Sequence, residues 1–169
     1  MAVVSFAVDD VIDGLVSTIR AAASFRAPDE AGSTVPVFDG AVYGAGSNFS
    51  AVVIGSNGLE DATQRPFRFT SEWHDLDLTT DETGQVECAV LVWSGDANPD
   101  TPATQRATAV GLLQDIDAAV RASNTAIALG VTQLLWSKID SGECFQTTEN
   151  GTETRLTFTY SYRALLQVT

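Results

Sequence analysis

The chain has few basic residues and a single histidine. Its 169 residues include 9 Lys and Arg against 22 Asp and Glu, which gives a formal net charge of −13. The nine cations are scattered along the sequence and predict no basic patch. A phosphate backbone or an anionic membrane surface would repel such a protein. We therefore expect neither sequence-specific nucleic-acid binding nor membrane binding.

Cysteines and long apolar runs are also scarce. The two cysteines, Cys88 and Cys144, lie in or beside strand-like runs, and neither has a second Cys or a His at metal-ligand spacing. We expect two buried, reduced thiols, while a disulfide between them stays open. No apolar run approaches the roughly 18 residues of a membrane span, and no basic region precedes the first apolar residues as in a signal peptide. These absences favour a protein made and kept in a cytosol.

The residues that catalysis usually needs are missing too. With one histidine, His74, a two-histidine metal motif is impossible, and neither a Gly-x-Ser-x-Gly elbow nor a phosphate-binding glycine loop occurs. His74 with Asp75 or Asp77 could bind a metal or act as an acid–base pair. On a strand, however, those carboxylates would point away from His74. We expect no catalytic residue, no metal and no cofactor, and keep a small acidic hydrolase or binding module as an alternative.

Two segments have helical periodicity, residues 8–25 and 102–123. The second has Pro102 at its first position, after two possible caps, Asp100 and Thr101. Strand-like patterns cover the remaining apolar segments: residues 35–42, 49–54, 67–73, 85–93, 131–139 and 155–163. Turn residues occur at 81–84, 140–142 and 149–151.

This order predicts an α+β fold in a single domain, residues 1–169. A single mixed or antiparallel β-sheet would pack against two main α-helices, in the order α-β-β-β-β-α-β-β. Residues 155–163 alternate, with Leu156, Phe158, Tyr160 and Tyr162 on one face and polar residues on the other. We therefore expect the helices to cover one face of the sheet, and the other face to be wet or covered by another molecule.

The apolar end of the chain, Leu-Leu-Gln-Val-Thr at 165–169, suggests contact with the chain itself or a neighbour. Ring assembly through sheet edges would be an economical use of such a fold. We expect contact loops at residues 140–151 and 55–66, where polar segments separate strands. The candidate contact residues are Trp73, Asp140, Phe145, Asn150, Leu166 and Val168.

In pattern and order, nearly the whole chain resembles the tail terminator, or tail completion, proteins of phages with long non-contractile tails, especially those of actinobacteria. The most specific piece is Val-Glu-Cys-Ala-Val-Leu-Val-Trp-Ser-Gly-Asp at 86–96, followed by the helix that carries Arg106. The first helix, Asp39-Gly40, Ala-Val-Val-Ile-Gly at 51–55, Ala-Leu-Gly at 128–130 and the last alternating strand also fit.

The resemblance implies a structural, non-enzymatic virion protein of the tail or neck, made in the host bacterial cytoplasm. Such subunits form a ring, usually of six copies, that stops polymerisation of the tail tube protein and joins the head-side connector, or stopper. Genome DNA passes through the hole without sequence-specific binding. The alternatives within the same particle are a head-completion protein and a tail tube subunit, which we would expect to have a longer β-hairpin arm and less helix.

Overall fold

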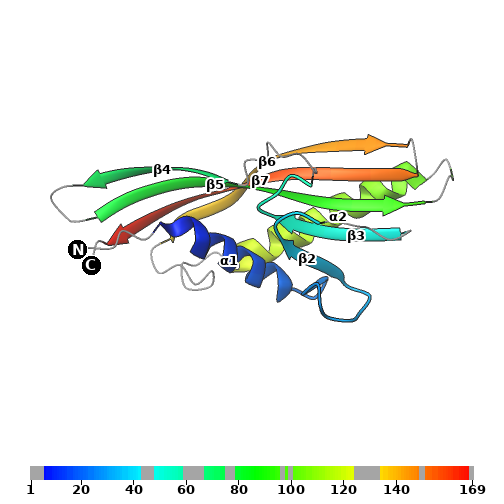
Figure 1. Cartoon of the computed structure of the whole chain (residues 1–169), viewed down its shortest axis with the longest axis horizontal. Helices are drawn as coiled ribbons and strands as arrows, with labels where there is room; N and C mark the ends of the chain where they lie inside the picture. The colour runs from blue at the N-terminus through cyan, green and yellow to red at the C-terminus, as the bar shows by residue number, and fades with distance from the viewer. Residues whose placement is uncertain are drawn as a thin grey trace.

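The computed structural model describes residues 6–42, 48–58, 67–74, 79–95, 98, 101–123, 134–148 and 151–167. It has an α+β fold with a mixed sheet (Figure 1). The elements are α1 (Ala7–Arg20), β1 (Phe25–Arg26), β2 (Val35–Asp39), β3 (Asn48–Ile54), β4 (Phe67–His74), β5 (Thr79–Ser94), α2 (Thr101–Ala122), β6 (Leu134–Thr147) and β7 (Thr152–Gln167). The predicted fold class is confirmed, with the two-residue β1 as an additional strand.

The sheet has the strand order β1-β2-β3-β5-β7-β6. The pairs β1–β2 and β2–β3 are parallel, and the other pairs are antiparallel. β4 lies outside this path because it shares one edge of β5 with β3. It pairs with residues 79–86 of β5, whereas β3 pairs with residues 88–94.

This shared edge divides the sheet into two regions. We call the first the arm: β4 with residues 79–86 of β5, 160–167 of β7 and 134–139 of β6. The rest of the sheet and both helices form the body. In Figure 1 the arm extends to the left, beyond the start of α1, while β5 and β7 run on through the body.

Both helices pack on the same face of the sheet, which we call the helix face. The predicted alternation in β7 is confirmed, because Leu156, Phe158, Tyr160 and Tyr162 are buried on this face. They join one apolar core with residues of α1, α2, β3 and β5. Burial of each large apolar side chain stabilises the fold by about 1.5–3 kcal/mol. The opposite face, which we call the open face, is covered by neither helix, and a small apolar cluster of described residues is buried there: Val53, Ala89 and Leu91.

Both predicted helices are present, but their details differ. α1 ends at Arg20 rather than at residue 25, because Phe25 is buried as a strand residue that pairs with Val35. α2 buries Gln105, Ala109, Leu112, Ile116 and Val120, whereas Val110 is 40% exposed. Apolar residues occur on several sides of this Ala- and Thr-rich helix, so periodicity alone did not single out its buried face.

Two predicted turns are wrong. Residues 81–84 lie inside β5, and residues 140–142 lie inside β6. β5 continues through Gly84 because the Tyr162 ring occupies the space beside this glycine. β6 continues past Asp140 because a register irregularity between Ile139 and Ser141 absorbs the extra residue. At the third predicted turn, Gly151 has a φ of 108° and adjoins the start of β7.

The two cysteines differ in environment. Cys88 is fully buried on the helix face, and burial raises the pKa of its thiol to about 12. Cys144 is exposed, so the expectation of two buried thiols is wrong for this residue, and both thiols are free. β7 lies between the strands that carry them, and the two residues are also offset along it, because Cys88 is opposite Phe158 and Cys144 is opposite Leu156. Their Cα atoms are therefore more than about 9 Å apart. A disulfide needs less than about 7 Å, so the two thiols cannot join within one chain.

Candidate assembly surfaces

The root of the arm is held by a buried carboxylate. Glu82 is completely buried on the helix face of β5. Its Oε2 accepts the backbone N–H of Ala7, the first residue of α1, at 3.3 Å, and its Oε1 accepts the Tyr162 hydroxyl at 2.7 Å. A carboxylate at a helix N-terminus satisfies a free N–H and interacts favourably with the helix dipole. Glu82 therefore ties α1, β5 and β7 together where the arm begins.

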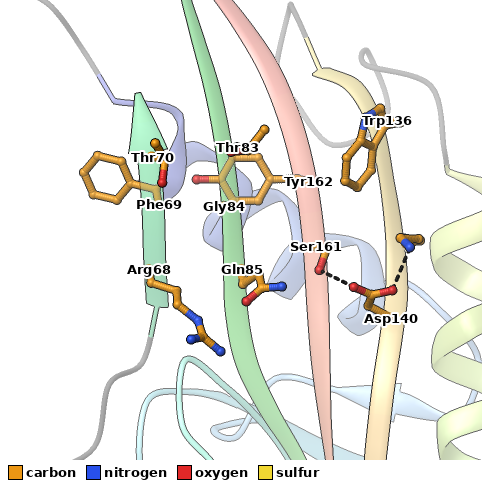
Figure 2. A pocket seen from close by; sticks show the side chains of 11 residues that line it. Arg68, Phe69, Thr70, Thr83, Gly84, Gln85, Trp136, Asp140, Ser161 and Tyr162 are labelled. Atoms are coloured by element: carbon orange, nitrogen blue, oxygen red, sulfur yellow. Dashed lines mark hydrogen bonds and ion pairs between the residues drawn. The ribbon is translucent and has the colours of Figure 1, made fainter. Parts of the chain in front are cut away.

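The Tyr162 ring lies across β5 beside Gly84 (Figure 2). A Cβ atom at position 84 would lie 2.3 Å from the ring, so only glycine leaves room for it. Burial and the hydrogen bond to Glu82 raise the pKa of the Tyr162 hydroxyl, which keeps it protonated as the donor. The sequence had placed Glu82 and Gly84 in a turn, and no local signal indicated this cluster.

Cations that are scattered in the sequence come together on the open face. Cross-strand register places Arg68, Lys138, Arg155 and Arg163 on this face. The face also carries carboxylates. Asp81 forms an ion pair with Arg163, and Asp140 lies 2.6 Å from Lys138. Four of the nine cations therefore share one face, which carries mixed charge rather than a basic patch.

A shallow hollow of about 280 Å³ lies on the open face of the arm (Figure 2). Arg68, Thr70, Gln85, Trp136 and Asp140 are among the residues that line it, and they come from β4, β5 and β6. Trp136 is 41% exposed, which is unusual for a side chain of this size. A polar hollow with an exposed indole is typical of a contact surface.

β6 forms a long edge of the sheet. It spans 14 residues and pairs only with β7 among the described strands. Nearly all of its residues from Asp140 onward are exposed, and so is Leu135. On the opposite side of the arm, β4 pairs only with β5 within the described chain. Free backbone N–H and C=O groups on such edges can pair with another strand.

The structure describes both the backbone and the side chain of three of the six candidate contact residues. Asp140 lies in β6, with its carboxylate held by Lys138 and by the Ser161 hydroxyl at 3.3 Å, and the Lys138 hydrogen bond lowers the pKa of Asp140. Phe145 is 45% exposed on the open face. Leu166 is half-buried and packs against the core, so it is a weaker candidate.

The other three candidates are placed in part or not at all. Trp73 pairs with Thr80 through its backbone in β4, and its side chain is outside the description, as are Asn150 and Val168. The predicted contact loop 140–151 is wrong in form, because residues 140–147 belong to β6. In the other predicted loop, 55–66, residues 59–66 lie outside the described residues.

His74 ends β4, opposite Thr79, while Asp75 and Asp77 lie outside the described residues. Within the described ranges, no group of three or more His, Cys, Asp or Glu side chains could hold a metal ion. None of the helices in this part of the chain is long and apolar enough to cross a membrane. The comparison with protein families finds no match, and neither does the comparison with curated proteins.

Proposed function

We propose that this protein is a structural subunit of a phage particle, a tail terminator that caps the tail tube as a ring of six copies. The observation that carries the proposal is a pair of edges on the arm, β4 on one side and β6 on the other, that pair with no other strand among those described. The resemblance in sequence pattern to tail terminators supplies the biological context.

The geometry of the arm supports ring closure. Its strands are arranged β4-β5-β7-β6, and every neighbouring pair is antiparallel. β4 and β6 therefore run in opposite directions, so β6 of one copy can pair with β4 of the next in the same antiparallel alternation. Head-to-tail contacts of this kind form a closed ring when the rotation between copies closes.

Charge supports the choice of the arm as the contact. Copies with a net charge of −13 repel one another. On the open face of the arm, Arg163 and Lys138 neutralise Asp81 and Asp140, and Trp136 adds apolar surface. The remaining acidic surface would face the lumen and the particle exterior, where it would let genome DNA slide without binding.

The proposal is tested first with the purified protein. We expect Leu135→Lys, at the exposed β6 edge, to prevent the rings that the wild-type protein forms in negative-stain images and native mass spectra. Val110→Lys is the matched control, because it adds the same charge at an exposed apolar residue on α2. Equal loss of rings in both variants would contradict an edge contact.

The decisive test uses particles made without the protein. We expect over-long tails or tails that are not joined to heads, because nothing would stop the tube or present the connector surface. Normal tail length and normal head attachment would refute the proposal. A His74→Ala variant that assembles normal particles would remove the hydrolase alternative.

The arm favours a second candidate, a tail tube subunit of the same kind of particle. We expected tube proteins to carry a longer β-hairpin arm, and the β4–β5 hairpin extends beyond α1 (Figure 1). The 14 residues of α1 and 22 of α2 favour a terminator, for which we expected more helix. Imaging separates the two, because a tube subunit polymerises into long tubes on its own, whereas a terminator stops at a ring.

A further inference from the structure

The segment that follows β3 crosses the open face with an asparagine–glycine pair, Asn57 and Gly58. Gly58 has a φ of 76°, in the left-handed region that glycine adopts far more readily than other residues. A Cβ atom at this position would also lie 2.7 Å from Leu91 and 3.4 Å from Ala89, two members of the buried cluster on this face. The fold therefore requires glycine at position 58.

A glycine after an asparagine makes the asparagine side chain chemically labile. The backbone nitrogen of the glycine attacks the side-chain Cγ atom, and the new C–N bond closes a cyclic succinimide. The bond from Cγ to the side-chain nitrogen breaks, and this nitrogen leaves as ammonia with the proton of the backbone N–H. Water then opens the ring at either carbonyl, which gives aspartate or isoaspartate. Any side chain on the attacking residue would hinder ring closure, and glycine has none.

Solvent reaches this pair in the folded protein. Asn57 and Gly58 are both half-buried rather than enclosed. Asn57 also lines a hollow of about 410 Å³ on the open face of the body, beside β6. The water that opens the succinimide, and the ammonia that leaves, therefore have a path between the pair and the solvent.

One hydrogen bond opposes the reaction. The Gly58 N–H group donates to the Ser56 Oγ atom at 3.1 Å. Ser56 is almost completely buried, which fixes the position of its hydroxyl group. The bond must break before the Gly58 nitrogen can lose its proton and approach the side chain of Asn57.

We infer that Asn57 is a site of slow, non-enzymatic deamidation, and that Ser56 retards the reaction through its hydrogen bond to Gly58. The inference is independent of the proposed function, because it depends only on the folded chain and water. The position is labile because the fold needs a glycine there, and Ser56 offsets part of that lability.

Deamidation would change the open face in two ways. Both products add a negative charge to a hollow that Glu87 and Glu143 already line, so repulsion within it would increase. Isoaspartate also inserts an additional carbon atom into the backbone before Gly58. Since Gly58 fits closely against Leu91, this longer backbone would loosen the cover over the buried cluster.

The test is peptide mapping by mass spectrometry after the purified protein has been kept at mildly alkaline pH. We expect Asn57 to convert to aspartate and isoaspartate, and to convert about twofold to tenfold faster in Ser56→Ala, the factor that corresponds to one hydrogen bond. Ser141→Ala is the matched control, because it removes a hydroxyl group from the lining of the same hollow and leaves the bond to Gly58 in place. Asn57→Gln should abolish the conversion, since the longer side chain closes a ring far more slowly.

Fragment spectra distinguish Asn57 from Asn150, which also precedes a glycine. An intact Asn57 in both the wild type and Ser56→Ala would overturn the inference, and equal rates in the two proteins would overturn the role of Ser56. Slow reaction of the Cys88 thiol shows that a variant is folded, because this residue is fully buried. If Ser56→Ala does not fold, hydrogen exchange at the Gly58 amide of the wild type decides the role of Ser56: we expect slow exchange, and fast exchange would refute it.

Discussion

The body and the arm share β5, β6 and β7 but are stabilised differently. In the body, β5 and β7 are covered by two helices, which pack on them through an apolar core. At the root of the arm, the same two strands bury Glu82 and Tyr162, and the first N–H group of α1 completes the contact. The hydrophobic effect does not depend on the direction of a contact, whereas a buried carboxylate needs hydrogen-bond donors at fixed positions around it. The difference suggests a stable body that carries an arm set at a defined angle.

The largest effect is expected in the body. Ile116 is fully buried between α2 and the sheet. We expect Ile116→Ala to lower the free energy of unfolding by about 2–5 kcal/mol, because it removes apolar contacts and leaves a cavity. Urea denaturation measures the loss, and hydrogen exchange should become faster in β3 and β4 alike. Faster exchange in β3 alone would show that the arm does not depend on the body.

A smaller and more local effect is expected at the arm root. Glu82→Ala leaves the Tyr162 hydroxyl and the Ala7 N–H without their acceptor, which costs about 1–3 kcal/mol. We expect β4 amides to exchange faster while β3 amides are unchanged. Glu82→Gln is the control, because the amide can still bond both groups. If Glu82→Ala affects β3 and β4 equally, the arm and the body are one cooperative unit.

The ion pair on the open face of the arm should matter least for folding. The Arg163 side chain is 45% exposed, so solvent screens its attraction to Asp81. We expect Arg163→Gln to change the free energy of unfolding much less than Glu82→Ala does, with a still smaller difference at high salt. A larger loss in the monomer would mean that this pair, rather than Glu82, orients the arm. Weaker ring formation without a loss of stability would instead support the proposed contact.

The reactivity of the two cysteine thiols tests the difference between buried and exposed parts of the sheet without a change in stability. Cys144 is exposed, and Cys88 is buried with its pKa raised to about 12. We expect one thiol to react at once with a disulfide reagent at pH 8, and Cys144→Ser to abolish this fast phase.

The contribution of the buried Cys88 thiol to stability depends on pH. The raised pKa means that burial of neutral Cys88 contributes fully to stability below pH 9, and that this contribution falls as pH rises from about 9 towards 12. Immediate reaction of both thiols would show that the body opens readily. Measurement of the free energy of unfolding between these pH values checks that stability falls as the pH rises.

Local patterns were enough for the strands with one buried face and for the existence of both helices. Alternation in residues 155–163 predicted the buried face of β7 correctly. Turn residues were less reliable, because Gly84 and Gly142 occur inside long strands. Gly84 is there to accommodate the Tyr162 ring, a partner 78 residues away that no local window includes.

The contact surfaces were predicted only in part. Phe145 and Asp140 were named as contacts, and both lie on the exposed β6 strand. Arg155 was taken as one polar residue on the uncovered face of the sheet, and the hollow of about 410 Å³ that it lines beside β6 was missed. This hollow depends on the positions of β5, β6 and Asn57, which come together only in the folded chain.

By itself, the sequence determined the charge, the α+β composition and the alternation that gives the sheet a covered face and an open face. These properties depend on residue type and on spacing along one strand or helix, so they can be read locally. Tertiary structure alone decided which edges stay unpaired, which cations share a face and which carboxylate is buried. Those outcomes depend on strand order and register, where a shift of one residue would turn every side chain of a strand to the other face.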